Sequence, residues 1–250
     1  MRGRDRSASN ASTPLTGRVA LITGTLSTIS VATARLLVDE GARVALTVSP
    51  SASAHVDALA AQIRGAGGQI LSFPADLGTR ARARTLVRRV VEEWGRLDIL
   101  VVAGGYDATA VLPTEGATAR PRLGQPHPAV RGLLHVAIAA LPQMERQGGG
   151  DIVVVAPVAG HVLRAGVGGL ASARVALEVA ALCDNLRQRG DPHGIRVAVV
   201  EPAGRASRSD AHNPASLTTE DVADAILYVL TRPPRVSIAE ILLQPTNRPA

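Results

Sequence analysis

The chain has 250 residues and a formal net charge of +6, and all 27 of its basic residues are arginine because it contains no lysine. This composition excludes Schiff-base chemistry, a P-loop lysine and a lysine in a proton relay. The length suits one α/β domain with a full hydrophobic core. The single cysteine, Cys183, excludes an internal disulfide and indicates a reducing compartment, so we expect a cytoplasmic protein.

The arginines do not indicate a nucleic-acid site. Their densest run, "TRARARTLVRR" at 79–89, alternates with apolar residues at helical spacing and leaves Arg80, Arg84 and Arg88 on a solvated face. Aromatic residues do not interleave with the arginines, as they do in many nucleic-acid-binding surfaces. Residues 1–14 are basic and Ser-rich, which predicts a disordered extension, and no apolar run is long enough to span a bilayer. We therefore expect no nucleic-acid or membrane partner.

From residue 15 to residue 250, short apolar runs alternate with helical patterns. A continuous apolar run bounded by turn residues is typical of a strand that is buried on both faces. We expect strands at 18–23, 43–48, 69–76, 97–105, 151–157, 195–202 and 237–245. Strands that alternate with crossover helices predict a single-domain, Rossmann-like α/β fold with a doubly wound parallel sheet flanked by helices.

The spacing of apolar residues predicts which helix faces are buried. Ile29, Ala32, Leu36 and Leu37 recur at helical spacing before Gly41, which is typical of a helix end. A second helix through 56–63 ends at Gly65, and the arginine-bearing helix presents a stripe formed by Leu86, Val87, Val90, Val91 and Trp94. Late in the chain, a long helix is expected to bury Cys183 among Leu177, Ala180, Ala181 and Leu186.

Several segments together carry a family resemblance. They are "ITG" after the first strand, "ADL" after the third, "GRLDILV" before the fourth, "GGGDIVVV" into the fifth, "PHGIRVAVVEP" and "DVADAILYVL". In this combination the chain resembles the classical short-chain dehydrogenases/reductases over nearly its whole length. The resemblance implies an NAD(P)-dependent oxidoreductase with a glycine-rich loop and a Tyr-Lys-Ser-Asn tetrad.

The glycine-rich loop departs from the family pattern TGxxxGxG. Over "TGTLSTIS" Gly24 is kept, but Thr28 and Ser30 replace the second and third glycines. Glycine at these positions lets the backbone approach the pyrophosphate and lets the helix pack on the strand. Asp76 matches the aspartate that contacts adenine in the family, although a helix N-cap explains it equally well. We expect no tightly bound cofactor, and NAD(P) if any.

The catalytic positions depart as well. The resemblance places the tetrad asparagine, serine, tyrosine and lysine at Ala129, Pro157, Leu170 and Arg174. Leu170 cannot exchange a proton and Arg174 keeps its proton near neutral pH. General acid–base assistance typically contributes about 10²–10⁴ in rate. We therefore predict that classical hydride transfer is lost. Prolines around 121–128 also predict that the first half of the helix before the fifth strand is broken.

Three functions remain open. The first is a pseudoenzyme that acts by association, as a homo-oligomer or as a hetero-oligomer with a subunit of the resembled family. The second is a cofactor-independent isomerase, cyclase or lyase that takes a small-molecule ligand in the vacated pocket and uses Tyr106, His161 and Arg164. The third is an atypical NAD(P)H-dependent reductase. The histidines show no metal-ligand spacing, so no metal site is expected.

Overall fold

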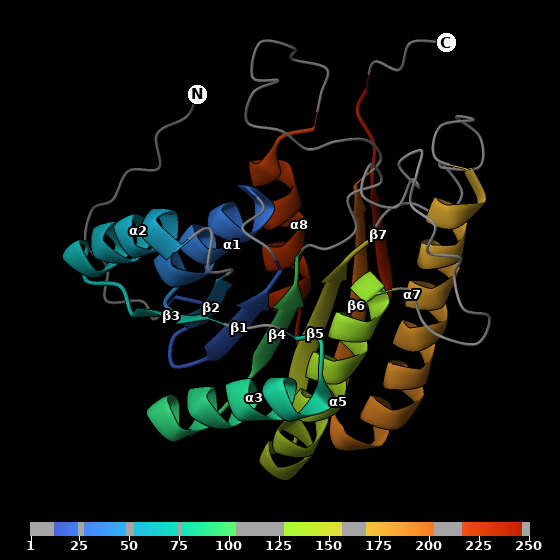
Figure 1. The fold of residues 1–250 in the computed structure, drawn as a ribbon, viewed down its shortest axis with the longest axis horizontal. Coiled ribbons are helices and arrows are strands. Elements are labelled where there is room, and N and C mark those ends of the chain that lie inside the picture. The colour runs from blue at the N-terminus through green and yellow to red at the C-terminus, as the bar shows by residue number, and fades with distance from the viewer. Residues whose placement is uncertain are drawn as a thin grey trace.

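The computed structural model describes residues 13–24, 28–48, 53–74, 77–103, 128–156, 169–202 and 217–246. Its centre is a seven-stranded parallel sheet (Figure 1), which confirms the fold that the sequence predicts. The strands are β1 (Val19–Thr23), β2 (Arg43–Val48), β3 (Ile70–Pro74), β4 (Ile99–Val102), β5 (Gly150–Val155), β6 (Ile195–Pro202) and β7 (Glu240–Leu243). The expected strands lie at these places, with ends that differ by a few residues.

The strand order is β3-β2-β1-β4-β5-β6-β7. The chain therefore winds outward from β1 to β3 and then returns to the other side of β1 at β4. The carboxyl ends of β1 and β4 form the switch point of the sheet. In open α/β sheets, ligands bind in the crevice at such a point.

Helices cover both faces of the sheet (Figure 1). One face packs against α3 (Arg80–Trp94), α5 (Pro128–Gln147) and α7 (Gly169–Gly190). The other face packs against α1 (Thr28–Asp39), α2 (Ser53–Gly65) and α8 (Thr219–Leu230). A short 3-10 turn, η2 (Asp191–His193), leads from α7 into β6. No helix in the described ranges is long and apolar enough to cross a membrane.

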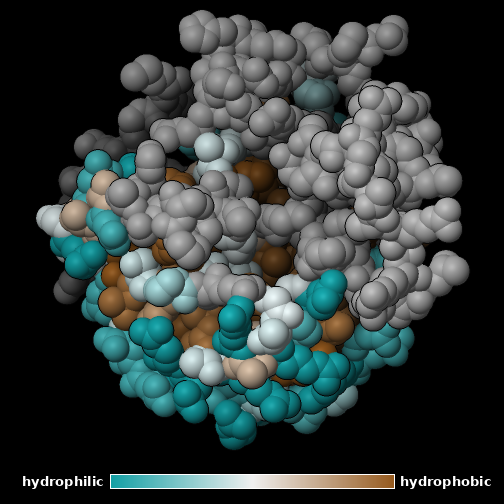
Figure 2. All heavy atoms as spheres, viewed as in Figure 1, coloured by the Kyte–Doolittle hydropathy of each residue, from teal (hydrophilic) through white to brown (hydrophobic). Residues whose placement is uncertain are grey.

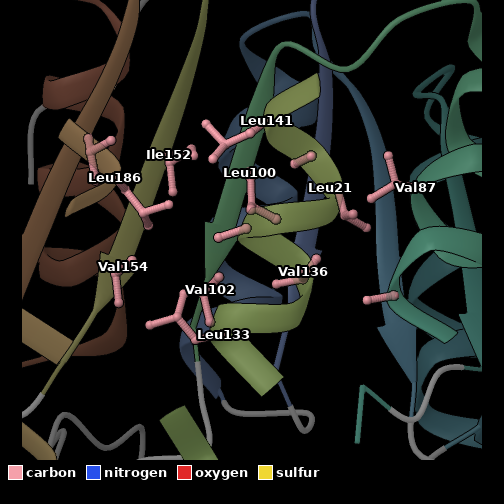
Figure 3. Close-up of a cluster of buried hydrophobic side chains, with 14 of the residues drawn as sticks. Leu21, Val87, Leu100, Val102, Leu133, Val136, Leu141, Ile152, Val154 and Leu186 are labelled. Carbon is pink, nitrogen blue, oxygen red and sulfur yellow. The ribbon is translucent and has the colours of Figure 1, made fainter. Parts of the chain in front are cut away.

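Aliphatic side chains build the core, as the scarcity of aromatic residues requires. Figure 3 shows Leu21, Leu100 and Ile152 of three neighbouring strands facing Leu133 and Val136 of α5. All five are almost completely buried. Figure 2 shows hydrophilic residues over the lower half of the molecule in this view. The expected exposure of Arg80, Arg84 and Arg88 on α3 is confirmed.

The residues predicted to form the inner face of α1 lie about one position away from those that are buried. Leu37 is buried as expected, but its buried companions are Ser30, Thr33 and Ala34. Ile29, Ala32 and Leu36 are only half-buried. The reason is that α1 packs against α8 as well as against the sheet, so the innermost face carries small residues that permit close approach.

The predicted packing of α7 is correct for Cys183 and Leu186, which are both buried. It is wrong for Leu177, Ala180 and Ala181, which are exposed. The buried face instead runs through Val175, Val179, Cys183 and Leu186 against the sheet. An apolar strip therefore remains on the outer side of α7.

The expected break in the helix before the fifth strand concerns residues around 121–128. Positions 121–127 lie outside the described residues. Within them α5 starts at Pro128, at the first helical position, where its missing N–H costs no hydrogen bond. The helix then continues through Pro142 to Gln147, although a proline inside a helix usually favours a break.

Ion pairs join the strands at the amino edge of the sheet. The carboxylate of Asp151, at the start of β5, is almost completely buried and binds Arg18 before β1 and Arg196 in β6. The Arg196 Nε lies 2.7 Å from Asp151 Oδ1, and its Nη1 donates to the carbonyl of Arg232 at 3.0 Å. This cluster fixes the segment after α8 on the sheet. It lies at the opposite edge from the switch point.

Candidate functional site

At the switch point the structure describes Gly24 on one side of the turn and the start of α1 on the other. Gly24 follows β1 with φ +135°, in the region that favours glycine, and α1 begins four residues later. The first turn of α1 directs its backbone N–H groups and the positive end of the helix dipole toward the crevice. The backbone conformation of Gly24 is thus one that favours glycine, and its contact with a cofactor stays a prediction.

Ser30 makes an internal hydrogen bond across this switch point. Its side chain is fully buried, and its hydroxyl donates to the carbonyl of Ala103, just after β4, at 3.1 Å. The backbone N–H of Ala103 in turn donates to the carbonyl of Thr23, at the end of β1, at 2.8 Å. The serine at the third glycine position therefore joins α1 to β4 and directs its hydroxyl into the protein rather than toward a ligand.

Thr28 occupies the first residue of α1 and is exposed. In the family the residue at this position is glycine, so that the phosphates can approach bare backbone. A branched side chain on the first helical residue occupies that space. The residues of this loop that the structure describes therefore do not fit the pyrophosphate of a dinucleotide as the family binds it, and we derive no chemical step through that group.

The structure places two of the tetrad positions on one helix. Leu170 and Arg174 both lie in the first turns of α7, four residues apart, and such residues share a helix face. Ala129 lies in the first turn of α5, and Pro157 comes two residues after the end of β5. The side chains at these four positions lie outside the described residues. Alanine, proline and leucine offer no group that transfers a proton.

One of the two tyrosines can be excluded as a replacement proton donor. Tyr228 lies near the carboxyl end of α8, with the Arg232 guanidinium 4.0 Å from the centre of its ring. The carbonyl of Arg232 accepts a hydrogen bond from Arg196, the second residue of β6. Tyr228 therefore lies at the amino edge of the sheet, away from the switch point. The other tyrosine, Tyr106, lies outside the described residues.

The remaining candidates for a rebuilt pocket are not placed by the structure. His161 and Arg164, like Tyr106 and Asp76, lie outside the described residues. The structure therefore neither brings them together nor separates them. No group of three or more metal-ligating side chains occurs in the part of the chain that is described. Nδ1 of His135 is instead hydrogen-bonded to the carbonyl of Leu77 at 2.9 Å.

Cys183 does not act as a nucleophile. It lies in α7 with its side chain fully buried in the core, and this burial raises the pKa of its thiol to about 11. The nearby Arg187 lowers that pKa, and the carboxylates of Asp184 and Glu201 raise it. A thiol without solvent access or thiolate character is inert, which agrees with the structural role that the sequence predicts.

A family model described as "short chain dehydrogenase" matches residues 18–216. The chain is 29% identical to the glycine betaine reductase ATRR of Emericella nidulans, a match that covers 94% of this chain but 19% of that protein. The chain therefore spans about a fifth of the length of that relative. It is also 27% identical to an uncharacterized oxidoreductase of Staphylococcus haemolyticus, over 93% of this chain and 99% of the relative.

Solved structures show the same fold. A short-chain dehydrogenase/reductase from Serratia marcescens superposes with a TM-score of 0.73 and 25% identity, over 93% of this chain and 98% of that one. A metagenomic short-chain oxidoreductase in complex with NADP gives a TM-score of 0.68 at 24% identity, over 94% of this chain and all of that one. Both proteins therefore share the fold of this chain.

Proposed function

Because the chain belongs to the short-chain dehydrogenase family, we propose that it is a member without classical hydride transfer that acts by association with another subunit. One observation carries the loss of chemistry. The proton donor and its activating lysine belong four residues apart on α7, and Leu170 and Arg174 stand there. A hydrocarbon and a permanently charged guanidinium cannot perform the proton transfer that those positions serve.

The cofactor side of the proposal depends on the switch point. A bound dinucleotide needs close approach of phosphate to backbone at the start of α1, and Thr28 adds a branched side chain there. The hydroxyl of Ser30 is bonded to Ala103 and offers nothing to the phosphates. The N-terminus of α1 still attracts anions, so weak binding of NAD(P) is expected rather than a tightly held cofactor.

The association side of the proposal depends on the outer side of α7. Leu177 is 66% exposed, the most exposed of the large hydrophobic side chains in the described ranges. Ala180 and Ala181, three and four residues later, are exposed beside it. We call these three residues the α7 patch. The two alanines permit close approach of another helix, and Leu177 supplies apolar area to bury.

The oligomeric state tests the association. Light scattering after gel filtration should give a particle larger than one chain, alone or with a related subunit from the native host. Leu177→Glu should dissociate it, because a carboxylate in the centre of an apolar contact is costly to bury. Gln188→Glu adds the same charge at another exposed position of α7 and should leave the assembly intact. A monomer at all concentrations that recovers no related subunit would refute the association.

The atypical reductase stays a second candidate because of specific observations. Gly24 keeps its glycine-only conformation, and a structural neighbour is in complex with NADP. Relatives are also named as oxidoreductases or reductases. A reductase of this kind would need a proton from a group other than Leu170 or Tyr228. Micromolar affinity for NADPH together with carbonyl reduction would favour the atypical reductase over association as the function of this chain.

A further inference from the structure

The outer side of α3 carries a row of exposed arginines. Arg80, Arg84 and Arg88 lie four residues apart, so they share one face of the helix. An α-helix rises 1.5 Å per residue, which separates neighbouring members of the row by about 6 Å along the axis. Helix α3 lies at the lower edge of the molecule in Figure 1, where Figure 2 shows hydrophilic residues. We call these three arginines the α3 stripe.

The α3 stripe opposes the stability of the helix that carries it. Like charges four residues apart on a helix repel each other. The first turn holds Arg80 and Arg82 and no acidic residue, although the positive end of the helix dipole favours carboxylates there. The helix is otherwise well capped, since the hydroxyl of Thr79 accepts a hydrogen bond from the N–H of Arg82 at 3.3 Å. Helix stability therefore does not explain why these positions hold arginine.

Carboxylates of the neighbouring elements do not neutralise the α3 stripe. Glu92 lies 3.5 Å from Nε of Arg88, and both side chains are about two-thirds exposed. The neighbouring helix α5 has one carboxylate, Glu145, which forms its ion pair with an arginine of α7. In the part of the chain that the structure describes, Arg80 and Arg84 form no ion pair. The stripe thus presents charge that nothing described in the chain itself balances.

We propose that the α3 stripe binds an acidic segment of another protein, held in an extended conformation with carboxylates at alternate residues. Alternate residues of an extended chain point to the same side and are about 6.6 Å apart, close to the spacing of the stripe. Complementary charge of this kind guides a partner to one surface.

A protein segment fits this surface better than a nucleic acid does. Proteins that bind single strands combine positive charge with aromatic side chains on which the bases stack. The one aromatic residue of α3, Trp94, is half-buried against the core. The stripe is also separate from the α7 patch, because α5 packs between α3 and α7. The inference is therefore independent of whether the chain associates through α7 or reduces a substrate.

Fluorescence anisotropy of the full-length protein with a labelled peptide tests the α3 stripe. A peptide of about ten alternating glutamate and serine residues, which spans the stripe when extended, should bind saturably at low ionic strength and weaken as salt is added. Arg84→Glu should weaken binding about tenfold or more, because it replaces an attraction by a repulsion at the centre of the stripe. Arg235→Glu makes the same change in net charge at an exposed position after α8, and should bind like wild type within about twofold.

A second variant separates loss of binding from loss of folding. Arg80→Glu places a carboxylate at the first residue of α3, four residues before Arg84, where the helix dipole and the opposite charge both favour it. This variant should therefore weaken peptide binding while the midpoint of urea unfolding stays the same or rises.

Three results would overturn the proposal. One is the absence of saturable binding of the peptide to the wild-type protein at low ionic strength. Another is equal weakening by Arg84→Glu and Arg235→Glu, which would assign the binding to net charge alone. The third is tighter binding of a single-stranded oligonucleotide with the same number of charges, weakened by Arg84→Glu, which would assign the surface to nucleic acid.

Discussion

Replacing Ser30 tests whether the third glycine position now carries an internal bond instead of a cofactor contact. In Ser30→Gly the hydroxyl that donates to Ala103 at 3.1 Å is lost, and the carbonyl of Ala103 loses that donor in a buried place. A neutral hydrogen bond contributes about 1 kcal/mol, and glycine in place of serine within a helix costs about 0.5 kcal/mol more. We therefore expect the free energy of unfolding to fall by about 1.5 to 2 kcal/mol.

Urea unfolding followed by circular dichroism measures this change, and Ser30→Ala separates its two parts. The alanine variant loses the hydrogen bond but not helix propensity, so it should be destabilised by about 1 kcal/mol. Thr28→Gly is the matched control, since Thr28 is exposed at the first residue of the same helix and should cost less. If Ser30→Gly leaves stability unchanged or raises it, then the internal bond does not hold α1 to β4 and the reasoning fails.

Three further predictions concern the core. Asp151→Asn should reduce stability by about 3 to 5 kcal/mol in thermal or urea unfolding, because two arginines lose the charge of a buried partner; a change below 1 kcal/mol would contradict the role of the cluster. Thr33→Val should raise the free energy of unfolding by about 1 kcal/mol, and with it the melting temperature, because the buried Thr33 hydroxyl lacks a partner in the described structure. A lower melting temperature would contradict this expectation. Cys183 should resist alkylation at pH 8 until unfolding, since a pKa raised from 9.0 to about 11 lowers the thiolate fraction about 100-fold; rapid reaction of the native protein would disagree.

The sheet could be predicted from sequence nearly completely. Parallel strands buried on both faces are continuous apolar runs, and these are visible without knowledge of their neighbours. Strand β6 was predicted with its observed bounds, and β5 differs by one or two residues at each end. Strand β7 was predicted too long, by three residues at its amino end and by two at its carboxyl end.

Helix faces were harder to predict, and physical reasons explain why. The innermost face of α1 carries Ser30 and Thr33, whose polarity resembles that of a solvated face when only the sequence is known. The outer side of α7 carries Leu177 with two alanines, which resembles a buried face for the opposite reason. In both cases hydropathy describes the burial of residue types on average, but it does not predict the burial of a single residue.

The candidate site also has features that are visible in the sequence and contacts that only the fold creates. Residue identities alone carry the prediction of a missing tetrad, because α7 holds Leu170 and Arg174 whatever their side-chain positions. The bond from Ser30 to Ala103 requires the pairing of β1 with β4. Residues so far apart in the chain give no local signal of their contact.

Calorimetric titration with NADPH, followed by a carbonyl-reduction assay on the same sample, tests the central claim most directly. With a hydrocarbon at position 170 and a branched residue at position 28, we expect no saturable binding tighter than about 1 mM, or about 4 kcal/mol, and no NADPH oxidation above background. Micromolar, saturable binding with carbonyl-dependent oxidation of NADPH would contradict the account.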